Sequence, residues 1–286
     1  MFWEQVINGL ALGSIYALIA VGYSLQLSIL RVFNLAHGEI MMLSTFAAYV
    51  AMSQGAGFGL AVLAAVACGV VLGLLLERFA LRPIKKPGEL APLIVTIGVG
   101  ALLQSGAVLM FGYEQRSFPR PNVSGYDLGF AYVTTVQIAI LAIGLLTLIG
   151  LNLLVHRSRF GRAVRATAEL PRIAGAFGVN VARVQLTTIA FSSGLGALAG
   201  ILIAMNFGVV TPFLGATFAL KALMVVIIGG RGSINGAFFS GIALGLLELV
   251  VAGQFLSEYR DAVAFAALLL VLILRPEGLL PSAKTR

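Results

Sequence analysis

The chain has 286 residues, of which 59% are apolar and only 10% are charged, and its mean hydropathy is +1.02. Soluble globular proteins carry roughly 25% charged residues, so this composition excludes a water-soluble enzyme and predicts an all-α, polytopic helical membrane protein. The 34 glycines follow no triplet period, which excludes collagen, and a single cysteine, Cys68, excludes an internal disulfide framework.

Nine apolar segments divide the chain, and we expect eight or nine of them to cross the membrane. A bilayer core about 30 Å thick requires roughly 20 helical residues, and the last segment is short for a full crossing. The segments are 5–30, 35–53, 57–79, 91–111, 133–155, 185–206, 209–229, 234–252 and 260–274. The seventh contains Pro212 and Lys221, so a re-entrant course is the alternative to a full span there. Residues 1–286 are thus expected to form a single transmembrane domain.

The net charge of +8 is better explained by membrane topology than by nucleic-acid binding, so no nucleic-acid partner is expected. If the first span runs from outside to inside, 15 of the 19 Lys and Arg residues fall on the cytoplasmic side. They are Arg31, Arg78, Arg82, Lys85, Lys86, Arg157, Arg159, Arg162, Arg165, Arg172, Arg183, Arg231, Arg275, Lys284 and Arg286. This distribution predicts an external N-terminus and a cytoplasmic C-terminus. The first five residues lack a basic stretch, so we expect no cleaved signal peptide.

Pairs of glycines four residues apart recur in four of the spans, and they predict faces on which helices pack closely. The pairs are Gly9 and Gly13, Gly69 and Gly73, Gly196 and Gly200, and Gly241 and Gly245. A weaker regularity is the similarity of the string RVFN at 31–34 to RGSIN at 231–235. It indicates a possible internal repeat, with chance similarity as the alternative.

Polar residues at the start of the second span form the first candidate site. One interpretation is local: Asn34 acts as the helix N-cap, and Glu39 lies near the positive end of the helix dipole. The other is functional: His37 and Glu39 face a pathway, a gate or a partner, because ionisable groups inside a membrane usually serve function. No metal site is expected, because residues two apart on a helix do not face each other and the other histidine, His156, is distant in sequence.

Uncharged polar residues on other spans are candidates for the lining of a solute path. Thr96 and Gln104 are eight residues apart and therefore share one helix face. Ser192 and Ser193 could join them in a narrow polar passage. The structural alternative is that such hydroxyls bond to carbonyls of their own helix.

Two charged residues, Lys221 and Glu248, lie within predicted spans, and we expect them to pair because unpaired charge at the bilayer centre is costly. An ion-coupled secondary transporter for a small solute, with His37, Glu39, Lys221 or Glu248 as a proton relay, is therefore an alternative function. A passive channel is a third class. Only a transporter driven by ATP would depend on a separate ATPase.

The segment 156–184 combines basic with apolar residues and is the largest cytoplasmic piece that the topology predicts. We expect an amphipathic helix that begins near Arg162 and is broken at Pro171, and it would present a surface to a cytoplasmic partner. Binding of anionic membrane lipid is the alternative for this loop. The chain contains no phosphate loop of the form GxxxxGK followed by Ser or Thr, so we assign it no catalytic residue and no cofactor.

Three strings carry a resemblance to a known family. They are NLAHGEIMML at 34–43, RATAE at 165–169 followed by GVN at 178–180, and IGGRGSINGA at 228–237. Together they resemble the inner-membrane permease of branched-chain amino acid ABC importers, the LivH type, and the resemblance extends from the first span to the last. The sequence departs from the family pattern at Asn235, where the family commonly has Pro.

The resemblance implies a bacterial inner-membrane permease that forms half of a translocation pathway for branched-chain amino acids, or for a related small polar solute such as urea or a short amide. It implies a second, LivM-like permease, two cytoplasmic ATPase subunits that bind the ATP, and a periplasmic solute-binding protein as partners. In this family the long cytoplasmic loop supplies the helix that couples the permease to the ATPase. Transferred to this chain, the coupling role falls on Arg162, Arg165, Ala166, Glu169, Pro171 and Gly178.

Overall fold

The computed structural model describes residues 2–84, 90–120, 124–127, 129, 131–254 and 260–280. The membrane-length and other long helices are α1 (Phe2–Leu30), α2 (His37–Ser53), α3 (Phe58–Leu75), α4 (Leu90–Phe111), α5 (Thr135–Arg157), α8 (Val181–Phe207), α9 (Leu214–Gly229), α10 (Ile234–Gln254) and α11 (Arg260–Leu274). Shorter elements are the π-helix η1 (Leu76–Leu81), α6 (Arg159–Glu169), α7 (Pro171–Ala176) and the strands β1 (Arg116–Ser117), β2 (Gly125–Asp127), β3 (Tyr132–Thr134) and β4 (Val209–Val210).

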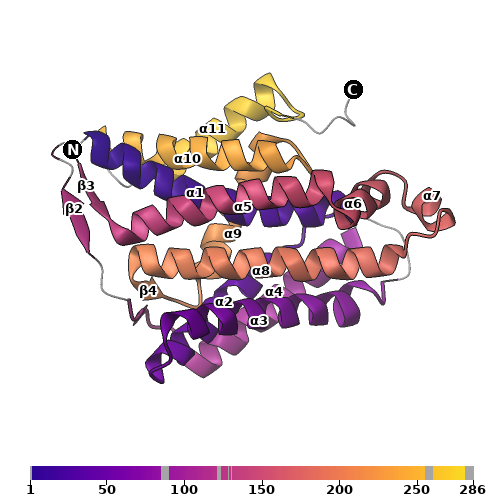
Figure 1. The fold of residues 1–286 in the computed structure, drawn as a ribbon, viewed down its shortest axis with the longest axis horizontal. Helices are drawn as coiled ribbons and strands as arrows, with labels where there is room; N and C mark the ends of the chain where they lie inside the picture. Colours follow the sequence, from indigo (N-terminus) through magenta and orange to yellow (C-terminus); the bar gives the residue numbers. More distant parts are fainter. Residues whose placement is uncertain are drawn as a thin grey trace.

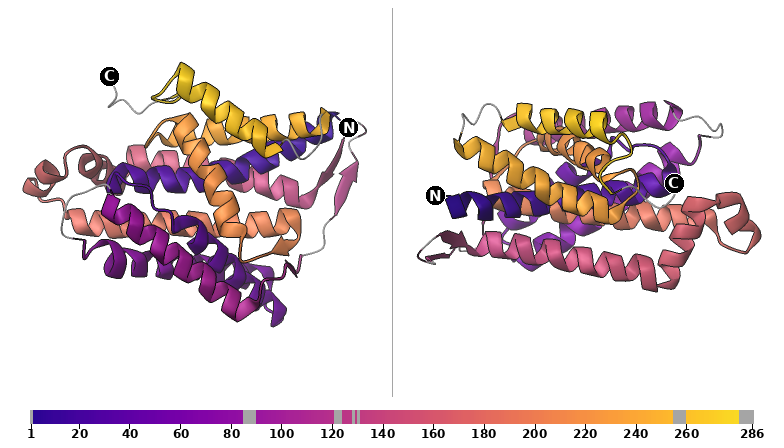
Figure 2. Two further views of the ribbon diagram at one scale, coloured as in Figure 1. Left: turned by 180° about the vertical axis from the view of Figure 1, so that it is seen from behind. Right: turned by 90° about the horizontal axis from the view of Figure 1, so that it is seen from above.

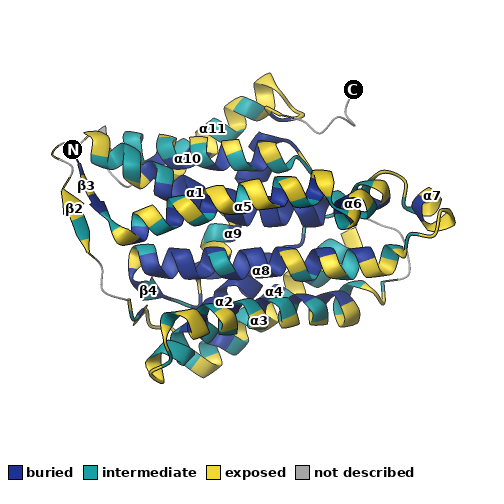
Figure 3. Cartoon of the chain, in the orientation of Figure 1, coloured by how far each residue is buried: buried dark blue, intermediate teal, exposed yellow. Residues whose placement is uncertain are grey.

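The long helices form one elongated bundle, in which α1 and α8 occupy the middle (Figure 1). Helix α9 runs obliquely across the others, which is clearest from behind (Figure 2). Figure 3 shows α1 and α8 largely buried, whereas the outer helices carry exposed apolar side chains such as Leu63, Leu102 and Leu146. An outer surface of this kind is what a helix needs where it faces lipid instead of water.

A helix lies within each of the nine segments predicted from the sequence, which confirms the all-helical membrane architecture. Among the described residues, six helices are long and apolar enough to cross a membrane: α1, α3 with η1, α4, α5, α8 and α10. Helices α2, α9 and α11 are shorter, with 17, 16 and 15 residues. The structure therefore supports six spans by length, and the expectation of eight or nine stays a prediction, as does the internal repeat.

The seventh segment begins later than expected. Gly208 ends α8 with a positive φ of 75°, and Val210 then pairs with Arg116 in the short β1–β4 ladder. Helix α9 starts at Leu214, after Pro212, because proline cannot donate a backbone hydrogen bond within a helix. These strands and the β2–β3 hairpin were not expected from the sequence, and β4 and most of β3 take up the first residues of two predicted apolar segments, 209–229 and 133–155.

All four predicted glycine pairs lie where two helices pack closely, which confirms their interpretation. A Cβ atom added at Gly13 would lie 2.8 Å from Cα of Ile242 on α10, and one at Gly69 would lie 2.9 Å from Cβ of Ala197 on α8. The remaining members show the same proximity to a neighbouring helix: Gly9 and Gly245 between α1 and α10, Gly241 against Ala17, Gly73 against Ser193, and Gly196 and Gly200 against α2. Small residues at such crossings allow backbones to approach without a hydrophobic driving force.

The amphipathic helix predicted after the fifth span is present, and its start differs by three residues. Helix α6 begins at Arg159 instead of Arg162, because the hydroxyl of Ser158 accepts a hydrogen bond from the Gly161 amide (2.9 Å) and caps the helix there. The break falls as expected, since α6 ends at Glu169 and Pro171 is the first residue of α7. Both short helices project from one end of the bundle (Figure 1).

Candidate functional site

A buried polar network joins α1, α2 and α8, with Gln26 at its centre. The side-chain amide of Gln26 donates to the Ser192 hydroxyl (2.5 Å) and to Nδ1 of His37 (3.2 Å). The Asn34 amide in turn donates to Oε1 of Gln26 (2.8 Å). None of these four side chains is more than 1% exposed. Buried polar groups are costly unless they are paired, so this network fixes how the three helices meet.

The turn between α1 and α2 brings Asn34 into this network. Its Oδ1 accepts from the Ala36 amide (3.2 Å), so the side chain does bind an amide two residues on, as expected. The assignment of Asn34 as the helix N-cap is nevertheless wrong, because α2 begins at His37 and its N-cap position is Ala36. The physical reason is that the other end of the Asn34 side chain is held by Gln26, which keeps it within the turn before the helix.

His37 is enclosed by the crossing of α1 and α8. The Tyr23 ring packs edge-on against it, with ring centroids 4.6 Å apart. A Cβ atom added at Gly22 or Gly196 would approach Nε2 of His37 to 3.2 or 3.1 Å, so glycine on both flanking helices makes room for the ring. Because Nδ1 accepts from Gln26, the neutral ring carries its proton on Nε2, and this buried atom has no hydrogen-bond acceptor among the described residues.

Glu39 points to a different part of the bundle from His37. A Cβ atom at Gly215 on α9 would lie 2.5 Å from its Oε2, and one at Gly100 on α4 would lie 3.6 Å from its Cγ. Oε2 is buried and has no hydrogen-bond partner within the described ranges. No group of three or more His, Cys, Asp or Glu residues that could hold a metal ion occurs in the part of the chain that the structure describes.

The other predicted path residues are only partly brought together. Thr96 lies beside the network, since its hydroxyl accepts from the Leu35 amide (3.2 Å) and donates to the Leu93 carbonyl (2.9 Å). Gln104 is half-buried two turns further along α4, about 12 Å away. Ser193 is buried against Gly73 of α3, so it faces away from its neighbour Ser192.

Gln26, the centre of the network, was not among the residues predicted from the sequence. Its signal was an uncharged amide near the end of an apolar span, eight residues before Asn34. That signal is weak, because a polar residue near a span end usually lies at the membrane surface. The Gln26 side chain is instead only 1% exposed, because α1 runs through the middle of the bundle along its whole second half.

The predicted pairing of Lys221 with Glu248 is confirmed. Nζ of Lys221 lies 3.0 Å from Oε1 of Glu248, between α9 and α10. The Tyr16 hydroxyl on α1 donates to the other carboxylate oxygen (2.9 Å), and Asp261 on α11 lies 2.9 Å from the same Nζ. Four helices are thus joined through one ion-pair cluster, which satisfies charges that would otherwise be buried without a partner.

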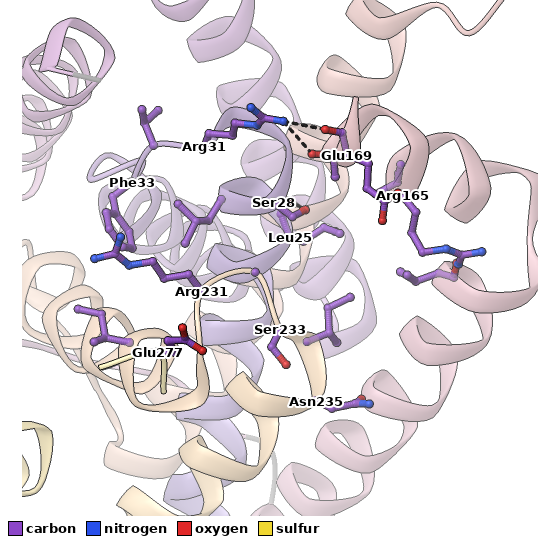
Figure 4. Close-up of a pocket in the computed structure, with 18 of the residues that line it drawn as sticks. Leu25, Ser28, Arg31, Phe33, Arg165, Glu169, Arg231, Ser233, Asn235 and Glu277 are labelled. Atoms are coloured by element: carbon purple, nitrogen blue, oxygen red, sulfur yellow. Dashed lines mark hydrogen bonds between the residues drawn. The ribbon is translucent and has the colours of Figure 1, made fainter. Parts of the chain in front are cut away.

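A cavity of about 990 Å³ lies at the C-terminal end of α1. Its wall is apolar in part, with Leu25 and Phe33 among the lining residues, and cationic in part, with Arg31, Arg165 and Arg231 (Figure 4). The strings 165–169 and 228–237, which are distant in sequence, therefore meet around one cavity.

The residues expected to couple to an ATPase differ in their surroundings. Arg162, Ala166, Glu169 and Gly178 are exposed, and Pro171 is half-buried. Arg165 is different, because its guanidinium donates to the Val155 carbonyl at the end of α5 and so holds α6 against α5.

Three large apolar side chains form an exposed patch on the projecting segment. Leu170, Ile173 and Phe177 are 56%, 50% and 85% exposed, and we call them the loop patch. Such a cluster at a helix end between basic residues is typical of a surface that a partner covers.

The apolar outer helices, the buried polar network and the projecting basic segment together define a multi-pass helical membrane protein. The model of the family "branched-chain amino acid transport system / permease component" matches residues 5–272. The chain therefore belongs to this family of branched-chain amino acid transport permeases.

Individual relatives agree with this assignment. The chain is 35% identical to the high-affinity branched-chain amino acid transport system permease protein BraD of Pseudomonas aeruginosa, over 98% of this chain and 95% of that protein. The identity and both coverages are the same for the permease protein LivH of Escherichia coli. A probable LivH of Methanocaldococcus jannaschii is 25% identical, over 96% of this chain and 92% of that protein. An ion-coupled secondary transporter, the alternative function, has no support from these relatives.

A solved structure, PsaBC from Streptococcus pneumoniae in complex with Fab, matches the fold with a TM-score of 0.53. The match covers 96% of this chain and 92% of that chain at 15% sequence identity. At this level of identity the similarity shows a shared fold alone.

Proposed function

We propose that this chain is the inner-membrane permease subunit of an ABC importer and forms half of the translocation pathway for branched-chain amino acids or a related small polar solute. The observation that carries the proposal is the 35% identity to BraD and LivH across almost the whole chain. The buried network is consistent with it, because a permease must hold polar groups inside the bilayer without exposing them to lipid.

We place the N-terminus outside and the C-terminus in the cytoplasm, with eight or nine spans. Three of the arginines that favour this topology, Arg31, Arg165 and Arg231, gather around the cavity at the C-terminal end of α1. The topology places Arg116 outside, and Arg116 lies away from this cavity, in strand β1, which pairs with β4 just after the C-terminal end of α8. Basic residues therefore concentrate at the end of the bundle from which α6 and α7 project, in line with the positive-inside rule.

The loop 156–184 is proposed to dock on one of two cytoplasmic ATPase subunits that bind the ATP. Arg162 and Ala166 are exposed one turn apart on α6, and the loop patch adds the apolar area that a protein contact needs. Pro171 separates α6 from α7, and Gly178 ends the projecting segment with a positive φ of 86°. Arg165 would contribute by holding α6 on α5. Glu169 would contribute as the last residue of α6, where its carbonyl accepts a hydrogen bond from Arg31. A second, LivM-like permease and a periplasmic solute-binding protein complete the proposed assembly.

Residues of the buried network and its neighbours are proposed to form a gate or part of the solute path. Asn34, His37 and Ser192 share the network, and Thr96 binds the adjoining turn. Glu39 lies between α4 and α9, and the bundle also buries Ser193 and half-buries Gln104. Small hydrogen-bonding groups of this kind suit an uncharged or zwitterionic solute, which a binding protein would already have selected.

The test is reconstitution of the chain with its expected partners in liposomes, followed by ATP-dependent uptake of radiolabelled leucine, isoleucine, valine and urea. Uptake of a branched-chain amino acid that requires ATP and the binding protein supports the proposal. Uptake by this chain alone on a proton gradient would overturn it in favour of a secondary transporter.

The docking surface has its own test. Phe177→Asp places a charge in the loop patch and should abolish co-purification of the ATPase. Tyr113→Asp is the matched control, because Tyr113 is also strongly exposed but lies beyond the far end of α4. Arg165→Glu is a poor test of docking, since loss of the Arg165 bond to Val155 would also disturb the packing of α6. Equal ATPase recovery with Phe177→Asp and the wild type would place the docking surface elsewhere.

A further inference from the structure

Arg31 ends α1 in an unusual backbone conformation. Its φ is +59°, and it is the one non-glycine residue with a positive φ among those the structure describes. Its amide donates to the Leu27 carbonyl (2.9 Å), which closes the last turn of α1. Glycine is the usual residue at such a helix end, because a Cβ atom is unfavourable in the left-handed region. An arginine at a position that favours glycine points to a use for its side chain.

The Arg31 side chain binds the end of α6. Its guanidinium donates to the carbonyl oxygens of Ala168 (3.2 Å) and Glu169 (3.0 Å), the last two residues of that helix (Figure 4). Carbonyls in the last turn of a helix lack partners further along the chain, and they form the negative end of the helix dipole. A guanidinium, with several donors in a fixed plane, can bind two such oxygens at once. Arg31 therefore fastens the C-terminal end of α6 to the C-terminal end of α1.

The same end of α1 carries the centre of the buried network. Gln26 lies five residues before Arg31 and binds Ser192 on α8 and His37 on α2. A movement of α6 that pulled on Arg31 would therefore act on one continuous helix and, through it, on two further helices. Beside this connection the cavity separates α6 from the residues that precede α10, including Arg231 and Ser233.

We infer that Arg31 is a positioning residue that transmits movement of α6 to the buried network, and so couples ATP hydrolysis on a partner to rearrangement of α1, α2 and α8. The inference rests on the proposed function, because it requires an ATPase that moves α6. It assigns to Arg31 a role distinct from docking, since its guanidinium binds the carbonyls at the end of α6 and not the loop patch.

The test uses the reconstituted complex and measures ATP hydrolysis and amino-acid uptake in the same vesicles. Arg31→Ala removes the guanidinium but keeps a Cβ atom in the unfavourable left-handed conformation, whereas Arg31→Gly removes the guanidinium and the Cβ atom together. In both variants uptake per ATP should fall by between about twofold and thirtyfold, the fold-change that corresponds to the coupling energy carried by residues of this kind. Arg31→Lys should restore part of the ratio, because an ammonium reaches the same carbonyls with less favourable geometry. Arg275→Ala is the matched control, an exposed cation just after the end of α11 and outside the loop 156–184, and should leave the ratio unchanged.

A second measurement separates coupling from a purely structural role. Hydrogen–deuterium exchange across 159–169 should rise in Arg31→Ala, and the thermal stability of Arg31→Gly should equal or exceed that of the wild type, because glycine accepts the backbone conformation without cost. Faster exchange in α6 with an unchanged ratio of uptake to hydrolysis would overturn the inference, as would wild-type behaviour in every measurement. If the wild-type complex shows no ATP-dependent uptake at all, the proposed function itself fails, and this inference fails with it.

Discussion

The side-chain amide of Gln26 donates a hydrogen bond to the hydroxyl of Ser192, 2.5 Å away, across the packing of α1 on α8. The Ser192 hydroxyl in turn donates to the Ile189 carbonyl one turn earlier in α8, so the hydrogen bonds form a chain. The buried Gln26 amide thus links α1 to α2 and α8, and each of its hydrogen bonds pairs a donor with an acceptor. We therefore expect the stability of the bundle to depend on Gln26.

Gln26→Leu should destabilise the permease by about 1–3 kcal/mol for each buried group left unpaired. The Asn34 amide would lose its acceptor, and the acceptors on Ser192 and His37 would lose their donor. Thermal unfolding of the purified complex in detergent measures the effect. Gln104→Leu is the control, because Gln104 is only half-buried and lies outside this network. Equal stability of the two variants would contradict the role given to Gln26.

The ion pair of Lys221 and Glu248 should show strong coupling in a double-mutant cycle. Lys221→Met or Glu248→Gln alone leaves the other charge of the pair without its counter-charge. Removal of one member of a buried pair costs about 3–5 kcal/mol. The double variant should be milder than the sum of the two, because neither charge is then left behind. Asp261→Asn should have a small effect, since the Asp261 side chain is 69% exposed. Strict additivity of the two single substitutions would show that the pair contributes little.

Gly13→Ala should impair the packing of α1 on α10. The added Cβ atom would lie 2.8 Å from Cα of Ile242, so the backbones must separate, and overpacking of this kind typically costs about 1–3 kcal/mol. The amount of folded protein in the membrane, measured by gel filtration after extraction, should fall. Gly98→Ala on α4 is matched to it, because nothing lies within 4 Å of a Cβ atom at that position. A loss of folded protein in Gly98→Ala of the same size would rule out the packing explanation.

Glu39→Gln should keep most of the ATP-dependent uptake of the wild type. The substitution preserves the shape that fits between Gly100 and Gly215, and an importer driven by ATP needs no titratable group at this position. Loss of uptake in Glu39→Gln, together with a requirement for a proton gradient, would instead identify Glu39 as a proton carrier. Parallel assays with and without an uncoupler make the distinction.

Features that depend on local composition could be read from the sequence. Within the described part of the chain a helix occupies each of the nine predicted apolar segments, and the four glycine pairs follow from a spacing of one helical turn. The pairing of Lys221 with Glu248 was predictable for a related reason, because two isolated charges of opposite sign inside apolar helices have few other ways to be satisfied.

Features that depend on which helices meet were not accessible in this way. Gln26 is a polar residue like several others until α1 is seen to be central in the bundle. Ser192 and Ser193 are adjacent in sequence, yet successive helical residues point about 100° apart, so one faces Gln26 and the other faces α3. The start of α2 at His37 likewise depends on the bond between Asn34 and Gln26, which links two elements on either side of a turn.

The contact between Tyr16 and Glu248 joins residues 232 positions apart, so α1 is synthesised long before its partner helix α10. Ribosomes add roughly 5–20 residues per second, and α1 therefore spends roughly 10–50 s in the membrane before α10 has been made. During that interval the glycine face of α1 and the Tyr16 hydroxyl have no native partner on α10. The packing of α1 is thus completed only after α10 has been made, although α1 precedes it by more than 200 residues.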